Sequence, residues 1–329
     1  MFLLEIIFSY LALVVPLLLA VAFFTLYERH VLAALQRRQG PNTIGYYGIF
    51  QALADGLKLF IKESIFPKSA NTFIFIVSPL FTFGLARTGW IVFPLGEGAF
   101  IVDFRLGLLF LFAISSLSVH SVIRAGWSSN SKYAFLGGLR SAAQRISYEV
   151  GLGSTLISVI LIAGTANLST RGEVQTNTVW LVGPLLPICI IFFIASLAET
   201  NRHPFDLPEA ESELVSGYNV EYSARGFALF SLAEYSNIIL RSALSALFFL
   251  GGWDQGILSV LGVPGIVAFA IKVRFFVTLF IIIRGALPRY RYDQLRRLGW
   301  KVILPLALAF IVVYASVLCT FNSFVEYSR

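Results

Sequence analysis

The segment from residue 199 to residue 225 concentrates side chains that can bind and release protons. It carries six carboxylates and only two arginines in 27 residues. In a helix or in an extended strand, several of these acids would share one face. Carboxylates crowded in this way raise one another's pKa and can hold a shared proton near neutral pH, which suits a proton relay. The six acids are Glu199, Asp206, Glu209, Glu211, Glu213 and Glu221.

An ordinary solvated acidic loop is the alternative interpretation of this segment. Pro204 and Pro208 prevent a continuous helix. Apolar residues such as Phe205, Tyr218 and Tyr222 alternate with the acids, which favours a loop folded against protein. A calcium loop is not indicated, because the Asp-x-Asp-x-Asp-Gly pattern is absent.

The composition shows what kind of scaffold must position these acids. The chain has 329 residues, of which 57% are hydrophobic and 13% are charged, whereas soluble domains carry about 25% charged residues. Disordered, collagen-like and soluble nucleic-acid-binding proteins are therefore disfavoured. We expect an all-α polytopic membrane protein. Its net charge of +7 then reflects loop residues that orient the spans, and we expect no nucleic-acid partner.

Runs of about 20 apolar residues, enough to cross the hydrocarbon layer as helices, predict eight membrane spans. Between the first two spans, residues 46–63 show apolar positions at helical spacing against a polar stripe, which predicts an amphipathic helix. This helix lies either in the membrane interface or against the spans of the same chain. No repeat or linker divides residues 1–329, so we expect one membrane domain. The predicted spans are 6–26, 72–94, 105–123, 139–163, 179–198, 226–250, 263–285 and 302–322.

The basic residues predict the orientation of these spans. Seventeen of the 25 lysines and arginines lie in the loops that follow odd-numbered spans, including the adjoining helical turns. By the positive-inside rule these loops face the cytoplasm-equivalent compartment, and both termini face the opposite side.

Glu149 lies within the fourth predicted span. A charge at the centre of a bilayer costs roughly 2.5 to 3.5 kcal/mol, so it requires a partner, a hydrated cavity or a function. A local ion pair with Arg145, one helical turn earlier, is the alternative to a functional role.

Glu234 and Arg241 lie in the sixth predicted span, seven residues apart. This spacing is roughly 10 Å along a helix, so we expect each to pair with another helix. Lys272 and Arg274 of the seventh span are the natural partners. Carboxylates and amines facing each other inside a membrane are typical of a proton path.

The sequence lacks the residues needed for redox chemistry within this chain. His120 is the one histidine in a predicted span, so no pair of axial haem ligands exists there, and Cys189 and Cys319 are isolated. No P-loop, nucleophile elbow or zinc motif occurs. We therefore expect the chain to carry no electrons by itself.

Several long segments resemble the quinone-site membrane subunit of respiratory complex I, the NADH:ubiquinone oxidoreductase subunit 1 family. The first inner loop resembles it from Glu28-Arg29 through Gln36, Arg38, Gly40-Pro41-Asn42 and Asp55 to Lys62-Glu63. The similarity continues through SNSKYAFLGGLRSAAQRISYEV at 129–150, AETNRHPFDLPEAESELVSGYNVEY at 198–222 and PRYRYDQLRRLGWK at 288–301, and so covers essentially the whole chain. His30 and Arg145 depart from the usual residues of the family.

The resemblance implies roles for particular residues. Those that would line the quinone chamber or its entrance are Arg29, Gln36, Arg38, Asp55, Phe230 and Arg284. Those that would form an acidic link from the chamber into the membrane are Asp206, Glu209, Glu211, Glu213, Glu221, Glu149, Glu199 and Glu234, and we add Lys272 to this relay because it is a buried amine.

The resemblance also implies an activity and its partners. Ubiquinone would be reduced beside an iron–sulfur cluster of a peripheral subunit, with FMN in another, and the acidic link would couple this step to antiporter-like membrane subunits. Lipids such as cardiolipin would surround the chain in the mitochondrial inner membrane, with the odd-numbered loops facing the matrix. A bacterial plasma membrane is the alternative location. The alternative functions are a subunit of a membrane-bound hydrogenase and a stand-alone proton or sodium transporter, although no inverted repeat favours the transporter.

Overall fold

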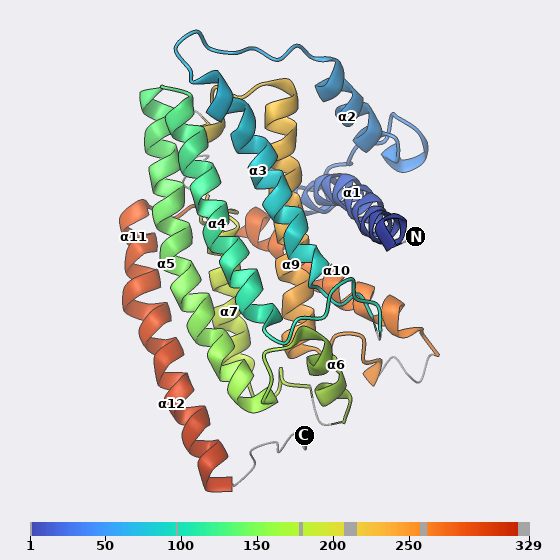
Figure 1. Ribbon diagram of the computed structural model, residues 1–329, viewed down its shortest axis with the longest axis vertical. Helices are drawn as coiled ribbons and strands as arrows, with labels where there is room; N and C mark the ends of the chain where they lie inside the picture. Colours follow the sequence, from blue (N-terminus) through green and yellow to red (C-terminus); the bar gives the residue numbers. More distant parts are fainter. Residues whose placement is uncertain (1, 97, 178–179, 207–215, 257–261, 322–329) are drawn as a thin grey trace.

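The chain folds into a helical bundle in a computed structural model, in which residues 2–96, 98–177, 180–206, 216–256 and 262–321 are described (Figure 1). Five helices lie side by side along the long axis of the bundle. Two further helices, α1 and α10, pack beside α9, and α12 packs alongside α5. The central five are α3 (Thr72–Ile91), α4 (Gly107–Ser128), α5 (Lys132–Ala163), α7 (Leu186–Glu199) and α9 (Ala224–Phe249); the other three are α1 (Phe2–Leu35), α10 (Gly265–Ala286) and α12 (Leu304–Phe321).

The expected all-helical membrane fold is confirmed. Six of the described helical segments are long and apolar enough to cross a membrane. Helix α7 is apolar but has 14 residues, or about 21 Å, while α9 has 26 residues but is more polar because it carries Glu234, Asn237 and Arg241. Together these eight helices correspond to the eight predicted spans.

Two helices extend well beyond their predicted bounds. Helix α1 continues to Leu35, so Glu28 and Arg29, which were expected in a loop, lie on a helix. Helix α5 begins at Lys132, seven residues before the predicted span, because the Ser131 side chain accepts a hydrogen bond from the Ala134 N–H and caps its first turn. Both extensions carry polar side chains to the end of the bundle where the acidic loop begins.

The amphipathic helix is present as α2 (Gln51–Ile61), beside the bundle at the upper right of Figure 1. It has no buried residue, and Leu53, Leu57 and Phe60 are 56%, 62% and 67% exposed. The apolar face of α2 is therefore not covered by the spans of this chain. This arrangement favours a membrane surface or another chain as its cover.

Shorter helical elements connect the long helices, including the single turns η1 (Tyr46–Gly48) and η2 (Gly217–Asn219). Helix α6 (Leu168–Asn177) lies in a segment that was expected to be a loop, at the end of the bundle opposite α2. Helix α11 (Tyr292–Arg297) continues through a π-helical segment, Leu298–Ile303, into α12. The described part of the chain therefore forms one connected bundle whose two ends are closed by different elements.

Candidate functional site

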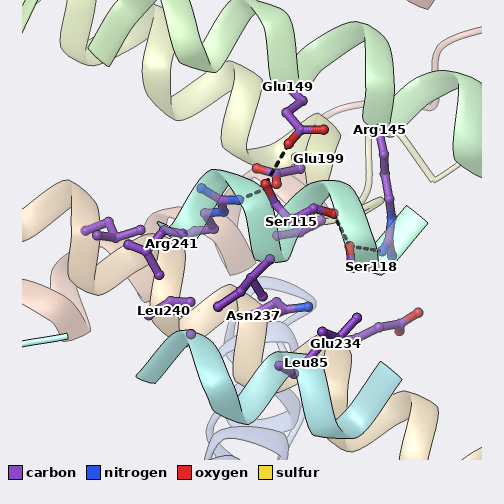
Figure 2. Close-up of a pocket in the computed structure, with 16 residues that line it drawn as sticks. Leu85, Ser115, Ser118, Arg145, Glu149, Glu199, Glu234, Asn237, Leu240 and Arg241 are labelled. Carbon is purple, nitrogen blue, oxygen red and sulfur yellow. Dashed lines mark hydrogen bonds and ion pairs between the residues drawn. The ribbon is translucent and has the colours of Figure 1, made fainter. Parts of the chain in front are cut away.

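A small cavity of about 40 Å³ lies between α3, α4, α5, α7 and α9 (Figure 2). This volume has room for a few water molecules. The ionisable residues that line it come from three helices, and we call the group the carboxylate cavity. Its charged members are Arg145, Glu149, Glu199, Glu234 and Arg241.

Glu199 and Arg241 form a buried ion pair between α7 and α9. Both side chains are 10% exposed. The second carboxylate oxygen of Glu199, Oε2, is buried and has no hydrogen-bond partner among the described residues. Arg241 therefore compensates the buried charge, while one oxygen stays free to accept a proton or a hydrogen bond.

Glu149 of α5 is held by α4. Its Oε1 atom accepts hydrogen bonds from the Ser115 hydroxyl at 2.8 Å and the Ser116 hydroxyl at 2.7 Å. No ion pair between Glu149 and Arg145 forms in this part of the structure, and Arg145 instead donates to the Ser118 hydroxyl at 3.5 Å. The local ion pair considered for these two residues is therefore not formed.

Glu234 of α9 accepts a hydrogen bond from the Tyr218 hydroxyl at 2.5 Å. The expectation that Lys272 or Arg274 pairs with it is wrong. Lys272 donates to carbonyl oxygens of the residues that follow the C-terminal end of α9, and the Arg274 guanidinium lies 5.0 Å from the centre of the Tyr27 ring. Residue spacing along α9 and α10 could not show that the two helices place these groups at different depths.

A second charged cluster lies where α1, α9 and α10 meet, and sequence reasoning missed its central residue, Glu28. This carboxylate is 5% exposed and forms ion pairs with Arg202, at 3.3 Å, and with Arg284. The Tyr235 hydroxyl donates to its other oxygen at 2.9 Å. Glu28 was overlooked because the first span was expected to end at residue 26. The signal that could have found it is a glutamate just after the predicted end of the first span, together with Arg202 and Arg284, which had no assigned acidic partner.

The charges of the two clusters act on one another. Arg202 interacts electrostatically with both Glu28 and Glu234. Burial opposes the charge of Arg202, but Glu28, Tyr235 and Glu234 together outweigh this effect and raise the pKa of the guanidinium, which stays charged. Arg145 interacts with both Glu234 and Glu199, and Glu149 interacts with Glu199. These pairwise interactions connect the Glu28 cluster to Glu149 through a row of charged groups.

The quinone-chamber residues expected from the resemblance make four separate sets of contacts. Arg29 pairs with Asp55 at 2.8 Å, joining α1 to α2, and Arg38 donates to the Gln36 side-chain oxygen at 2.8 Å. Arg284 belongs to the Glu28 cluster. The remaining residue, Phe230, is buried against the rings of Tyr218 and Tyr222.

The described part of the acidic loop is folded against the protein, as predicted. The Gln144 side-chain amide of α5 donates to the carbonyls of Ala198 and Phe205, at 2.7 and 2.8 Å. Asp206 pairs with Arg289 at 3.4 Å, and Glu221 is half-buried. The other predicted acids of this loop, Glu209, Glu211 and Glu213, lie outside the described residues.

His203 follows Arg202 in the same loop and is neutral at neutral pH. Burial and the nearby positive charge of Arg289 lower the pKa of its imidazole. Asp206 acts in the opposite direction but does not outweigh them. Burial and Arg289 therefore favour the neutral form of His203.

Fold and site together define a multi-pass membrane protein with interacting ionisable groups through its interior. A family described as NADH dehydrogenase matches residues 8–315. The NADH-ubiquinone oxidoreductase chain 1 of Chondrus crispus is 54% identical over 324 residues, which covers 98% of this chain and 99% of the relative. The same-named chain of Arabidopsis thaliana is 56% identical, covering 95% and 96%. An NADH-quinone oxidoreductase subunit of Paramagnetospirillum magneticum is 53% identical, covering 97% and 94%. The chain belongs to the NADH dehydrogenase family.

Proposed function

We propose that this chain is the core membrane subunit of a proton-pumping NADH:ubiquinone oxidoreductase. The observation that carries the proposal is the row of interacting charges from the Glu28 cluster, between α1, α9 and α10, to Glu149 between α4 and α5. Ionisable groups inside a membrane are costly, and such a row is typical of proton relays. The similarity of the whole chain to quinone oxidoreductase subunits supports this function.

In this proposal, quinone binds near the Arg29–Asp55 pair and the Gln36–Arg38 pair. Arg284 and Phe230 also line the quinone chamber. Quinone reduction at an iron–sulfur cluster of a peripheral partner, which receives electrons from FMN in another, changes the local charge. Asp206, Glu209, Glu211, Glu213 and Glu221 pass this change to Glu234, Glu199 and Glu149. Antiporter-like membrane subunits receive it.

The surroundings are part of the same proposal. The chain lies in the mitochondrial inner membrane with its odd-numbered loops facing the matrix, among lipids such as cardiolipin. The relatives named NADH-ubiquinone oxidoreductase chain 1 support this location, and the relatives named NADH-quinone oxidoreductase subunit support the alternative, a bacterial plasma membrane. Lys272 was also expected in the relay, but its bonds to backbone carbonyls support a structural role.

A Glu149→Gln variant of the assembled complex tests the relay. We expect quinone-coupled proton pumping to fall about tenfold or more, because the relay loses its last carboxylate. NADH oxidation by a hydrophilic artificial acceptor should persist, since it does not use this chain. Asp103→Asn is the matched control, because Asp103 contacts Ser169 outside the carboxylate cavity.

Three results would contradict the proposal. Equal pumping in the Glu149→Gln and Asp103→Asn variants would exclude Glu149 from the relay. Native purification of the chain as a carrier without flavin and iron–sulfur subunits would favour the transporter alternative. Co-purification with hydrogenase subunits that reduce no quinone would favour the other alternative, a subunit of a membrane-bound hydrogenase.

A further inference from the structure

Ser115 and Ser116 are neighbours on α4 that reach the same oxygen of Glu149. Their hydroxyls lie 2.8 and 2.7 Å from Glu149 Oε1. Ser115 lines the carboxylate cavity, whereas Ser116 is exposed on the outside of the bundle. The Glu149 carboxylate is therefore held between the interior cavity and the outer face of α4.

Each serine hydroxyl has a second acceptor within reach. Both lie 2.9 Å from the backbone carbonyl oxygen of Phe112. A hydroxyl carries one hydrogen and two lone pairs, so it donates to one acceptor at a time. The four distances thus describe two hydrogen-bond arrangements that need a rotation of each O–H group and no movement of the backbone.

The charge of Glu149 decides which arrangement is favoured. An ionised carboxylate accepts hydrogen bonds only, and bonds to a charged acceptor are about twice as strong as bonds to a neutral one. Both serines then donate to Glu149. A protonated Glu149 becomes a donor to one serine oxygen, and the hydroxyls are free to donate to the Phe112 carbonyl.

We propose that Ser115 and Ser116 are positioning residues for Glu149, a hydroxyl pair that accommodates both its charged and its protonated form. Ser115 holds the carboxylate toward the cavity, and Ser116 holds it toward the outer face, where a neighbouring subunit would exchange the proton. Each serine keeps its own proton; the proton that moves binds to the carboxylate and leaves from it. This inference rests on the proposed relay through Glu149.

The test uses the assembled complex with Ser115→Ala, Ser116→Ala and the double substitution. We expect quinone-coupled pumping to fall about threefold in each single variant and about tenfold in the double variant, because a charged carboxylate loses one or two donors. Electron transfer to a hydrophilic artificial acceptor should not change. The Ser115→Thr variant retains the hydroxyl and should therefore pump protons better than the Ser115→Ala variant.

Ser121→Ala is the matched control on the same helix, since the Ser121 hydroxyl donates to the Ser118 carbonyl and not to a carboxylate. Infrared difference spectra supply a readout that a folding defect would not reproduce. The C=O stretch assigned to protonated Glu149 by its loss in Glu149→Gln should move to higher frequency in the double variant, as its hydrogen bonds weaken.

The outcomes separate this inference from the proposed function. If Glu149→Gln pumps normally, the relay itself fails. If Glu149→Gln is impaired while the double serine variant has the pumping and infrared band of Ser121→Ala, the serine pair has no positioning role. A lower content of complex with unchanged pumping per complex would also overturn the inference. Impaired pumping together with the shifted band would establish it.

Discussion

Two ion pairs in this protein differ in burial, and the difference determines what each contributes. Arg29 and Asp55 are 49% and 37% exposed, so water and salt screen their attraction. Arg241 and Glu199 are 10% exposed, so bulk solvent screens their attraction much less. Truncating one member of such a buried pair leaves the other without compensation, which is strongly destabilising.

An Arg241→Gln substitution should therefore destabilise the chain by ~3–5 kcal/mol. The loss of stability should appear as a lower melting temperature and a lower yield of the solubilised complex. The double variant Arg241→Gln with Glu199→Gln should recover much of the stability, because both positions are then neutral, while pumping stays impaired. Equal stability of single and double variants would show that an unpaired charge is not the cause.

Individual carboxylates could be predicted from the sequence, but their partners could not. Glu149, Glu199 and Glu234 stand out because ionisable groups in apolar runs are rare. Their partners, two serines, an arginine and a tyrosine, depend on the lateral order and depth of the helices. Serine and tyrosine are common in such helices, so nothing in their type or spacing marks them as hydrogen-bond donors to a carboxylate.

At the scale of elements, helix α5 and the short helix η2 (Gly217–Asn219) approach closely enough to require glycine. A Cβ atom added to Gly137 would lie 2.7 Å from the Cα of Gly217 and 2.8 Å from the Tyr218 nitrogen. Gly217 itself has φ 61°, a left-handed conformation that glycine adopts readily. This contact positions Tyr218, whose hydroxyl donates to Glu234.

We expect Gly137→Ala to destabilise the chain by ~1–3 kcal/mol. The added methyl group would overlap main-chain atoms, which cannot move away by a side-chain rotation. It should also lower coupled activity by displacing Tyr218. Gly153→Ala on the same helix is the control: nothing lies within 4 Å of its Cβ, so it should be neutral or stabilise the helix. Thermal unfolding compares the two, and equal effects would contradict the close contact.

The whole molecule closes its two ends in different ways. At one end, the described part of the acidic loop packs against α5. At the other, the carbonyls that end α9 are satisfied by side chains from far along the sequence. Gln175 of α6 donates to the carbonyls of Leu247 and Phe248 at 3.0 and 3.1 Å. Lys272 of α10 donates to three carbonyls, those of Leu250, Gly252 and Asp254, at 2.6, 3.1 and 2.5 Å.

A Lys272→Met substitution should therefore reduce the amount of assembled complex, because it leaves several carbonyls unpaired at a cost of ~2 kcal/mol or more. Pumping per assembled complex should stay near its normal value. Lys68→Met, at an exposed loop position, is the control. Native gels measure the content of complex. Normal content with defective pumping would instead support the relay role expected from the sequence.

The sequence by itself determined the membrane class, the approximate positions of the eight helices and which carboxylates are exceptional, because each follows from local apolar periodicity and the cost of charge in hydrocarbon. Only the tertiary structure decided which groups meet. It placed Glu28 between two arginines, separated Lys272 from Glu234 and brought a serine pair to Glu149. These contacts depend on how helices distant in sequence are ordered and shifted against one another, which local patterns do not encode.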